Sequence, residues 1–223
     1  MPKASAAAER ARAAAIFDRL AAANPEPRGE LVWTSPFTLL VSVVLSAQAT
    51  DAAVNKATAP LFAIAGTPPA MAALGEAAIE RAIASIGLFR TKARNVAALS
   101  RALIAEHGGE VPLEREALQA LPGVGRKTAS VVLNELGAEA AIAVDTHVFR
   151  VAHRLKLSNG KTPADVEADL MRITPKPRRT RAHHWLILHG RYVCLARKPR
   201  CEACILADLC PSRPLFARGG HSP

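Results

Sequence analysis

The stretch LPGVGRKTA, residues 121–129, decides the fold because it sets a glycine-rich turn between two segments with helical periodicity. Residues 113–121 and 126–136 repeat apolar side chains at intervals of three and four, which predicts a helix on each side. Glycine permits positive φ values and close approach of the backbone to a partner. We therefore predict the layout of a helix-hairpin-helix over about 113–137, although an ordinary tight turn between helices would show the same pattern.

The rest of the chain also has the spacing of helices, and no segment shows a convincing alternating strand pattern, so the predicted class is all-α. The 223 residues suffice for one or two domains. Two proline-containing stretches are predicted to be loops, namely TPPA and TPKPRRTR. Helices are expected at 4–23, 36–47, 79–86, 91–106, and from a cap at Asp145 onward.

Positive charge is concentrated toward the C-terminal part of the chain. The formal net charge is +10, and residues 170–201 contain no Asp or Glu. Such a distribution predicts an anionic polymer, most simply nucleic acid, as the partner, against the simpler alternative of an ordinary basic protein. The cations of this stretch are Arg172, Lys176, Arg178, Arg179, Arg181, Arg191, Arg197, Lys198 and Arg200.

An uncharged stretch at 31–50 is long enough to span a bilayer, but Pro36, Gln48 and several hydroxyl residues interrupt it. The first residues carry charges where a signal peptide requires an apolar core. We therefore expect no membrane association and no export signal. In a reducing compartment, the four cysteines are not expected to form a disulfide framework.

The cysteines follow the spacing C-x6-C-x2-C-x5-C, at Cys194, Cys201, Cys204 and Cys210. Structural zinc usually takes two close pairs, whereas one close pair with two outliers favours an iron–sulfur cluster; zinc and coincidental thiols remain open at this point. The interval between the first two cysteines, LARKPR, is cationic. Held by its ligands, this loop could meet phosphates at a small ordering cost through Arg197, Lys198 and Arg200.

Lys127 and Asp145 are the candidate catalytic pair. An ammonium near a helix N-terminus with cationic neighbours is disfavoured as a charge, and a neutral amine is a nucleophile for Schiff-base chemistry. The simpler interpretation of Lys127 is a solvated phosphate-binding lysine. Asp145 could orient a nucleophile or stabilise an oxocarbenium-like sugar, although a plain helix N-cap is its simpler interpretation.

Taken in order, these segments strongly resemble the endonuclease III family of DNA glycosylases with AP lyase activity. The resemblance rests on LPGVGRKTA, on VDTH around Asp145 and on the cysteine spacing, with LSAQATD and HHWLILHGRY in support. It extends over about residues 13–210. Each motif is moderately specific, and their succession is highly specific.

The resemblance implies a role for individual residues. Lys127 would attack C1′ of the damaged nucleotide, and Asp145 would assist base loss and activate the lysine. Gln48 would fill the gap left by the flipped nucleotide, and Leu88 would be an apolar wedge in the duplex. The four cysteines would bind a [4Fe-4S] cluster. The expected DNA-binding set is Gln48, Leu88, Gly123, Gly125, Arg126, Arg197, Lys198 and Arg200.

The family fold implies two α-helical domains with DNA in the cleft between them. Residues 29–139 would form a six-helix domain with the hairpin, and 1–28 together with 140–223 would form the iron–sulfur cluster domain. The implied substrates are oxidised or ring-saturated pyrimidines and abasic sites in double-stranded DNA, nicked 3′ to the site by β-elimination. A monomeric, cytoplasmic, nucleoid-associated bacterial protein is expected.

Two alternatives remain. The mismatch-specific adenine glycosylase resembles the chain in hairpin, aspartate and cysteine spacing, but it lacks a lysine at the position of Lys127 and carries a further C-terminal domain. A non-catalytic DNA-binding module would use the hairpin only as a phosphate clamp. The joint presence of Lys127 and Asp145 argues against that module.

Overall fold

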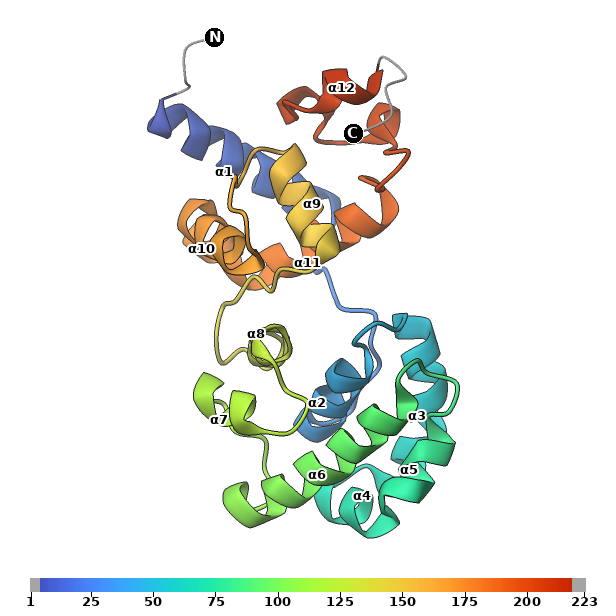
Figure 1. Ribbon diagram of the computed structural model, residues 1–223. Helices are drawn as coiled ribbons and strands as arrows, with labels where there is room; N and C mark the ends of the chain where they lie inside the picture. Colours follow the sequence, from blue (N-terminus) through green and yellow to red (C-terminus); the bar gives the residue numbers. More distant parts are fainter. Residues whose placement is uncertain (1–4, 218–223) are drawn as a thin grey trace. The chain divides into compact units, whose positions relative to one another are not determined.

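The computed structural model describes residues 5–217, which are helical with no strand among them, as the sequence predicts (Figure 1). The α-helices are α1 (Ala6–Ala23), α2 (Pro36–Leu45), α3 (Asp51–Ala65), α4 (Pro68–Leu74), α5 (Glu76–Ala82), α6 (Phe89–His107), α7 (Arg115–Ala120), α8 (Arg126–Glu135), α9 (Thr146–Arg154), α10 (Pro163–Ile173), α11 (Arg179–Tyr192) and α12 (Arg213–Ala217). Short 3-10 turns lie at η1 (Lys176–Arg178), η2 (Cys201–Ala203) and η3 (Ala207–Leu209).

The described chain divides into two compact units. The central unit is Gly29–Glu139, which holds α2 to α8. The terminal unit brings both ends of the chain together, with α1 from before Arg28 and α9 to α12 from after Ala140. Each unit therefore has its own set of helices to position functional side chains.

In the central unit, α2 is a buried helix whose start is fixed by its sequence. Ser35 caps it through a capping box with Thr38, and Pro36 occupies the first helical position. Every residue of α2 after Pro36 is buried, and α2 contacts α3, α6 and α8. The helix ends at Leu45 rather than near residue 47 as predicted, because Gln48 takes a left-handed backbone conformation shortly afterwards.

Both predicted proline loops are partly helical. In TPPA, Thr67 caps α4 and the two prolines stand in its first turn. In TPKPRRTR, residues Lys176–Arg178 form η1 and α11 begins at Arg179. Proline is tolerated in the first helical turn because the N–H group that it lacks has no partner there anyway. The two loop predictions were wrong for this reason.

The terminal unit has a core formed by α1, α9, α10 and α11. Ile16 and Phe17 of α1 are fully buried in it, and Leu186 of α11 joins them. The indole Nε1 of Trp185 donates a hydrogen bond of 2.8 Å to the carbonyl of Asn24 at the end of α1. The N-terminal helix is thus an integral part of the unit that holds the cysteines.

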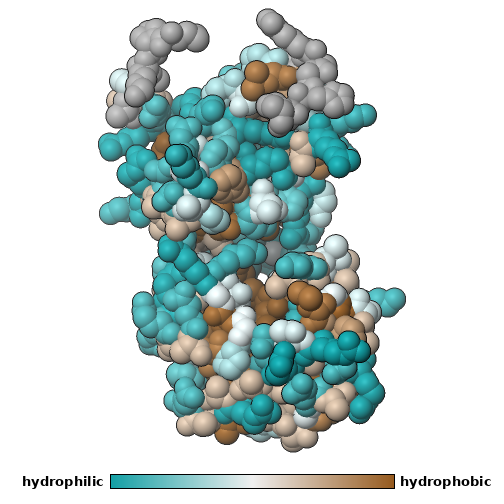
Figure 2. Space-filling model, viewed as in Figure 1, coloured by the Kyte–Doolittle hydropathy of each residue, from teal (hydrophilic) through white to brown (hydrophobic). Residues whose placement is uncertain are grey.

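The surface is mixed in polarity. Figure 2 shows hydrophilic side chains over most of the visible face of the terminal unit, and hydrophobic side chains reaching the visible face of the central unit. Within the described residues, no single helix is long and apolar enough to cross a membrane. Only α3 and α4 taken together meet the length and composition criterion, and they are bent by 98°.

Candidate nucleic-acid interface and cysteine site

The hairpin between α7 and α8 contains two glycines with different structural requirements. Gly123 has φ +80°, and a Cβ at this position would lie 2.9 Å from Nδ2 of Asn95 on α6. Gly125 has φ −93°, and a Cβ there would meet nothing within 4 Å. Only Gly123 is therefore required by the turn itself. Gly125 itself borders open space at the start of α8.

Lys127 is the second residue of α8 and is exposed. No side chain caps this helix at Gly125, and the start of a helix is a position at which backbone N–H groups favour an anion. Arg115 of α7 fixes the position of α8, because its guanidinium donates to Oγ of Ser130 at 2.9 Å and to Glu139 at 2.7 Å. No pattern in the sequence points to Arg115, because its partners are 15 and 24 residues away.

Gln48 and Leu88 both have positive φ values, 54° and 60°, and both are exposed. The left-handed conformation is strained for residues with a Cβ, and such strain is concentrated at functional positions. Their two turns are neighbours, since a Cβ at Gly87 would lie 3.8 Å from the carbonyl oxygen of Gln48. The two residues to which the family resemblance assigns the gap-filling amide and the wedge therefore lie in neighbouring turns.

Asp145 is the N-cap of α9, as predicted. Its Oδ1 accepts a hydrogen bond of 2.8 Å from the backbone N–H of Val148, and the side chain is half-buried. Among the described residues, Oδ2 has no hydrogen-bond partner. Capping by one oxygen thus leaves the second free for chemistry. Asp145 belongs to the terminal unit and Lys127 to the central unit.

The four cysteines are free thiols, and they line one cavity of the terminal unit. Among the described residues, no three His, Cys, Asp or Glu side chains are grouped to hold a single metal ion. A cubane cluster takes one thiolate on each of its irons, so its ligands surround a volume rather than a point. The donor set and its arrangement around a cavity therefore fit an iron–sulfur cluster.

Polar hydrogens point at the sulfurs. The backbone N–H of Leu206 donates to Sγ of Cys204 at 3.4 Å, and Nη1 of Arg154 donates to Sγ of Cys194 at 3.4 Å. Nε2 of His189 lies 3.7 Å from Sγ of Cys204, and burial lowers the pKa of His189 to about 4. Burial and the neighbouring cysteines raise the pKa of Cys201. Bound iron would offset this penalty on the thiolate forms.

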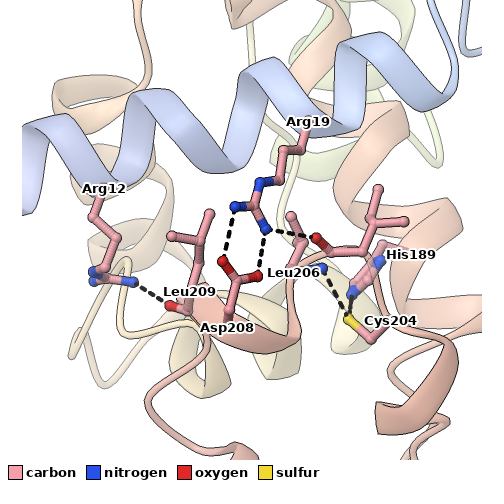
Figure 3. Close-up of polar contacts among 8 residues, drawn as sticks. Arg12, Arg19, His189, Cys204, Leu206, Asp208 and Leu209 are labelled. Carbon is pink, nitrogen blue, oxygen red and sulfur yellow. Dashed lines mark hydrogen bonds and ion pairs between the residues drawn. The ribbon is translucent and has the colours of Figure 1, made fainter.

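The cysteine segment is held in place by α1 (Figure 3). The guanidinium of Arg19 forms a fork on the carboxylate of Asp208, with Nη2 to Oδ2 at 2.8 Å, and also donates to the carbonyl of Ile205 at 3.0 Å. Arg12 donates to the carbonyls of Leu155 and Leu209. These contacts join α1 to the end of α9 and to the residues between the third and fourth cysteines.

Two arginines of α9 hold the same segment from another element. Nη1 of Arg154 donates to the carbonyl of Leu195 at 2.7 Å, and its Nη2 to that of Ala196 at 2.7 Å. Nε of Arg150 donates to the carbonyl of Cys194 at 3.1 Å. Their spacing of four residues on one helix face was a possible signal, but sequence alone could not identify carbonyls some 40 residues away as the acceptors.

The basic C-terminal stretch is only partly available to an external anion. Arg172 pairs with Asp169 at 2.7 Å, and Arg178 pairs with Asp18 at 2.9 Å. By contrast, the three cations of the loop between the first two cysteines are exposed. They are Arg197, Lys198 and Arg200, the residues predicted to meet phosphates.

Comparison with known proteins agrees with this geometry. Residues 41–176 match the family model described as HhH-GPD superfamily base excision DNA repair protein, and residues 194–210 match that of the iron-sulfur binding domain of endonuclease III. Endonuclease III of Treponema pallidum is 57% identical over 196 residues, which cover 88% of this chain and 93% of the relative. That of Escherichia coli K12 is 53% identical over 195 residues, covering 87% and 92%.

Two solved structures are similar to the chain as a whole. A trapped endonuclease III–DNA covalent intermediate, in an estranged-adenine complex, has a TM-score of 0.83 at 46% identity and covers 89% of this chain and 93% of its own. A non-covalent endonuclease III–DNA complex has a TM-score of 0.86 at 45% identity and covers 92% and 96%.

The fold and the cysteine site define a base excision repair protein of the helix-hairpin-helix class. The chain belongs to the endonuclease III family, which confirms the resemblance inferred from its motifs. It is accordingly a DNA glycosylase with AP lyase activity that acts on double-stranded DNA and carries a [4Fe-4S] cluster.

Proposed function

We propose that the chain removes oxidised or ring-saturated pyrimidines from double-stranded DNA and nicks the strand at the resulting or pre-existing abasic site, with Lys127 as nucleophile. The observation that carries this proposal is the exposed amine of Lys127 at the uncapped start of α8, immediately after the glycine hairpin. A helix N-terminus attracts a phosphate, and a lysine in the first turn then stands beside the sugar of the bound strand.

In the first step, the neutral amine of Lys127 attacks C1′ of the damaged nucleotide and the glycosidic bond breaks. The bonding electrons leave with the base, which takes a proton. The sugar ring then opens to give an imine between Nζ and C1′. Loss of a proton from C2′ and of the 3′ phosphate, by β-elimination, cuts the strand. Hydrolysis of the imine releases the enzyme.

Asp145 has two tasks in this proposal. Its Oδ1 is engaged by the N–H of Val148, which fixes the carboxylate in one orientation. Its second oxygen stabilises the positive charge that develops on the sugar and takes the proton that the nitrogen of Lys127 loses after its attack on C1′. Asp145 can therefore be the N-cap of α9 through one oxygen and act in catalysis through the other.

The hairpin and the two strained turns bind DNA without reading its sequence. Gly125 leaves room for the phosphate backbone at the start of α8, and Arg126 adds a cation there. Leu88 enters the duplex as a wedge, and Gln48 donates to and accepts from the base left without a partner. Strain at both positions is consistent with a function that outweighs its cost to stability.

The [4Fe-4S] cluster, bound through the four cysteine thiolates, supplies a cross-link that fixes the segment 194–210. The residues of this segment then present Arg197, Lys198 and Arg200 to the DNA backbone. We accordingly assign 1–28 with 140–223 as the cluster domain and 29–139 as the hairpin domain. We further propose that the protein acts as a monomer on the bacterial nucleoid in the cytoplasm.

The test is covalent trapping. The protein is incubated with a duplex containing one thymine glycol, borohydride is added, and a protein–DNA adduct is sought beside the Lys127→Gln variant. We expect an adduct with the wild type only, with DNA binding retained in the variant. An adduct of equal yield in Lys127→Gln would refute the assignment of the nucleophile. Absence of any adduct despite binding would indicate a glycosylase without lyase chemistry.

A further inference from the structure

Lys92 of α6 is a buried cation that the proposed mechanism does not use. Its exposed fraction is 4%, and its Nζ has no hydrogen-bond partner among the described residues. Lysine is almost never fully buried unless it is paired, because removing an ammonium from water without a partner is costly. Burial correspondingly lowers the pKa of Lys92. Each unsatisfied group of this kind in a native protein needs an explanation.

Packing alone does not explain the choice of lysine. Lys92 is on the buried stripe of α6, together with Val96 and Leu99 at one and two turns along the helix. Methionine is a flexible, unbranched apolar residue of similar length that adapts to irregular core space. It could fill this position without the cost of the orphaned ammonium. The amine therefore has a use that the free protein does not show.

The surroundings of Lys92 indicate what that use is. Its backbone N–H donates to the carbonyl of Leu88 at 3.0 Å, and helical side chains lean toward the N-terminal turn, which here is the strained turn before α6. One turn further along α6, Asn95 contacts Gly123 of the hairpin. The backbone of Lys92 is therefore bonded to the Gly87–Leu88 turn, and Lys92 precedes by three residues the asparagine that contacts the hairpin.

The backbone carbonyls of the Gly87–Leu88 turn are the proposed acceptors for the ammonium of Lys92. Residues 84, 85 and 87 are exposed, so water can satisfy their carbonyls in the free protein, whereas the carbonyl of Leu88 already accepts the N–H of Lys92. When DNA covers the turn and Leu88 enters the duplex, that water is displaced, and the carbonyls need donors from inside the protein.

We propose that Lys92 is a positioning residue for this turn, and that its ammonium donates to main-chain carbonyls of the turn once DNA is bound. This inference rests on the proposed function, in which Leu88 is the wedge. Lys92 thus holds the wedge in its inserted position. The orphaned ammonium lowers the stability of the free protein and gains its partners only in the complex.

The test replaces Lys92 with methionine and uses Arg101→Met as the matched control, since Arg101 is exposed on the same helix and its loss removes the same charge. For Lys92→Met we expect the melting temperature to rise by about 2–6 °C, as an unsatisfied buried group is removed. We expect single-turnover base release to fall about tenfold, or about 1.4 kcal/mol. Fluorescence of 2-aminopurine opposite the lesion, which reports unstacking, should fall with it.

The proposed role predicts that Lys92→Met raises the melting temperature and at the same time lowers base release and 2-aminopurine fluorescence. A lower melting temperature for Lys92→Met would overturn the inference, because it would make Lys92 an ordinary stabilising residue. A higher melting temperature with unchanged base release and unchanged 2-aminopurine signal would overturn it as well. Failure of the wild type itself to form the borohydride adduct would instead contradict the proposed function.

Discussion

Gly123 packs directly against Asn95, so closely that a Cβ at position 123 would lie 2.9 Å from the amide nitrogen and 3.0 Å from the Cβ of Asn95. The hairpin can therefore pack this closely on α6 only because residue 123 has no side chain. Two residues on, Gly125 has no such neighbour and no unusual φ. The turn thus requires glycine at 123 but not at 125, and substitution of each by alanine tests this difference.

Gly123→Ala should lower the free energy of unfolding by about 1–3 kcal/mol, through strain at positive φ and the clash with Asn95. Gly125→Ala should cost less, at most about 1 kcal/mol, since alanine is a poorer N-cap than glycine, but it should weaken DNA binding about tenfold because the methyl group occupies space proposed for the phosphate backbone. Thermal melts and titrations with an abasic duplex at fixed salt measure both quantities. Equal DNA affinity for Gly125→Ala and the wild type would contradict the role of this open space.

Leu88→Gly should separate the wedge from the fold. Glycine relieves the left-handed strain at φ 60° but adds entropy to the unfolded chain, so we expect a change in stability below about 0.5 kcal/mol. Base release should fall at least about tenfold because the apolar wedge is lost. Ile64→Ala, at an exposed apolar position of α3, is the control and should leave base release unchanged. A Leu88→Gly variant with full base-release activity would argue against the wedge.

Arg19→Met should loosen the cysteine segment without touching a ligand. It removes the fork on Asp208 and the bond to the carbonyl of Ile205, which are exposed contacts, so the fold itself should change little. We expect faster loss of iron to a chelator, while Arg10→Met on the same helix should behave as wild type.

Cys204→Ser is the stronger change and should lose cluster and folded protein together. A stable, active, iron-free Cys204→Ser protein would contradict a structural cluster.

Asp169 predicts a pH dependence of stability. Hydrogen bonds from Ser158 and Arg172 hold the pKa of this carboxyl below its usual value. A depressed pKa stabilises the fold above the unfolded value of about 3.9, and this stabilisation is lost as pH falls through the folded value. Asp169→Asn should therefore cost about 0.5–1.5 kcal/mol at pH 7 and little near pH 2. Urea melts at both pH values measure this difference, with Glu110→Gln as the control. A constant difference would exclude ionisation as its source.

Local signals in the sequence predicted most of the helices, and the residues that end them explain why. Ser35 with Pro36, Asp145 and Gly137 all mark helix ends through chemistry that acts within a few residues. The left-handed conformations of Gln48 and Leu88 could not be predicted from propensity, because neither residue favours them. They arise only where neighbouring segments constrain the chain.

The candidate site was predictable where motifs carry it and not where distant segments meet. Lys127, Asp145 and the cysteines stand in short recognisable patterns. Arg154 holds the cysteine segment by donating to the backbone carbonyls of Leu195 and Ala196. Every residue has a backbone carbonyl, so no sequence pattern identifies these acceptors. The orphaned ammonium of Lys92 is visible only through its burial.

The pairing of Arg19 with Asp208 joins residues 189 positions apart, and this separation sets the order in which the protein can mature. During synthesis, α1 leaves the ribosome first and its apolar face has no partner until α9 to α11 follow. The central unit, whose residues are contiguous, can fold in the meantime. The terminal unit must close a very long loop, which is slow. All four cysteines can bind the cluster only after the last of them has emerged, so cluster insertion is a late step in the maturation of the terminal unit.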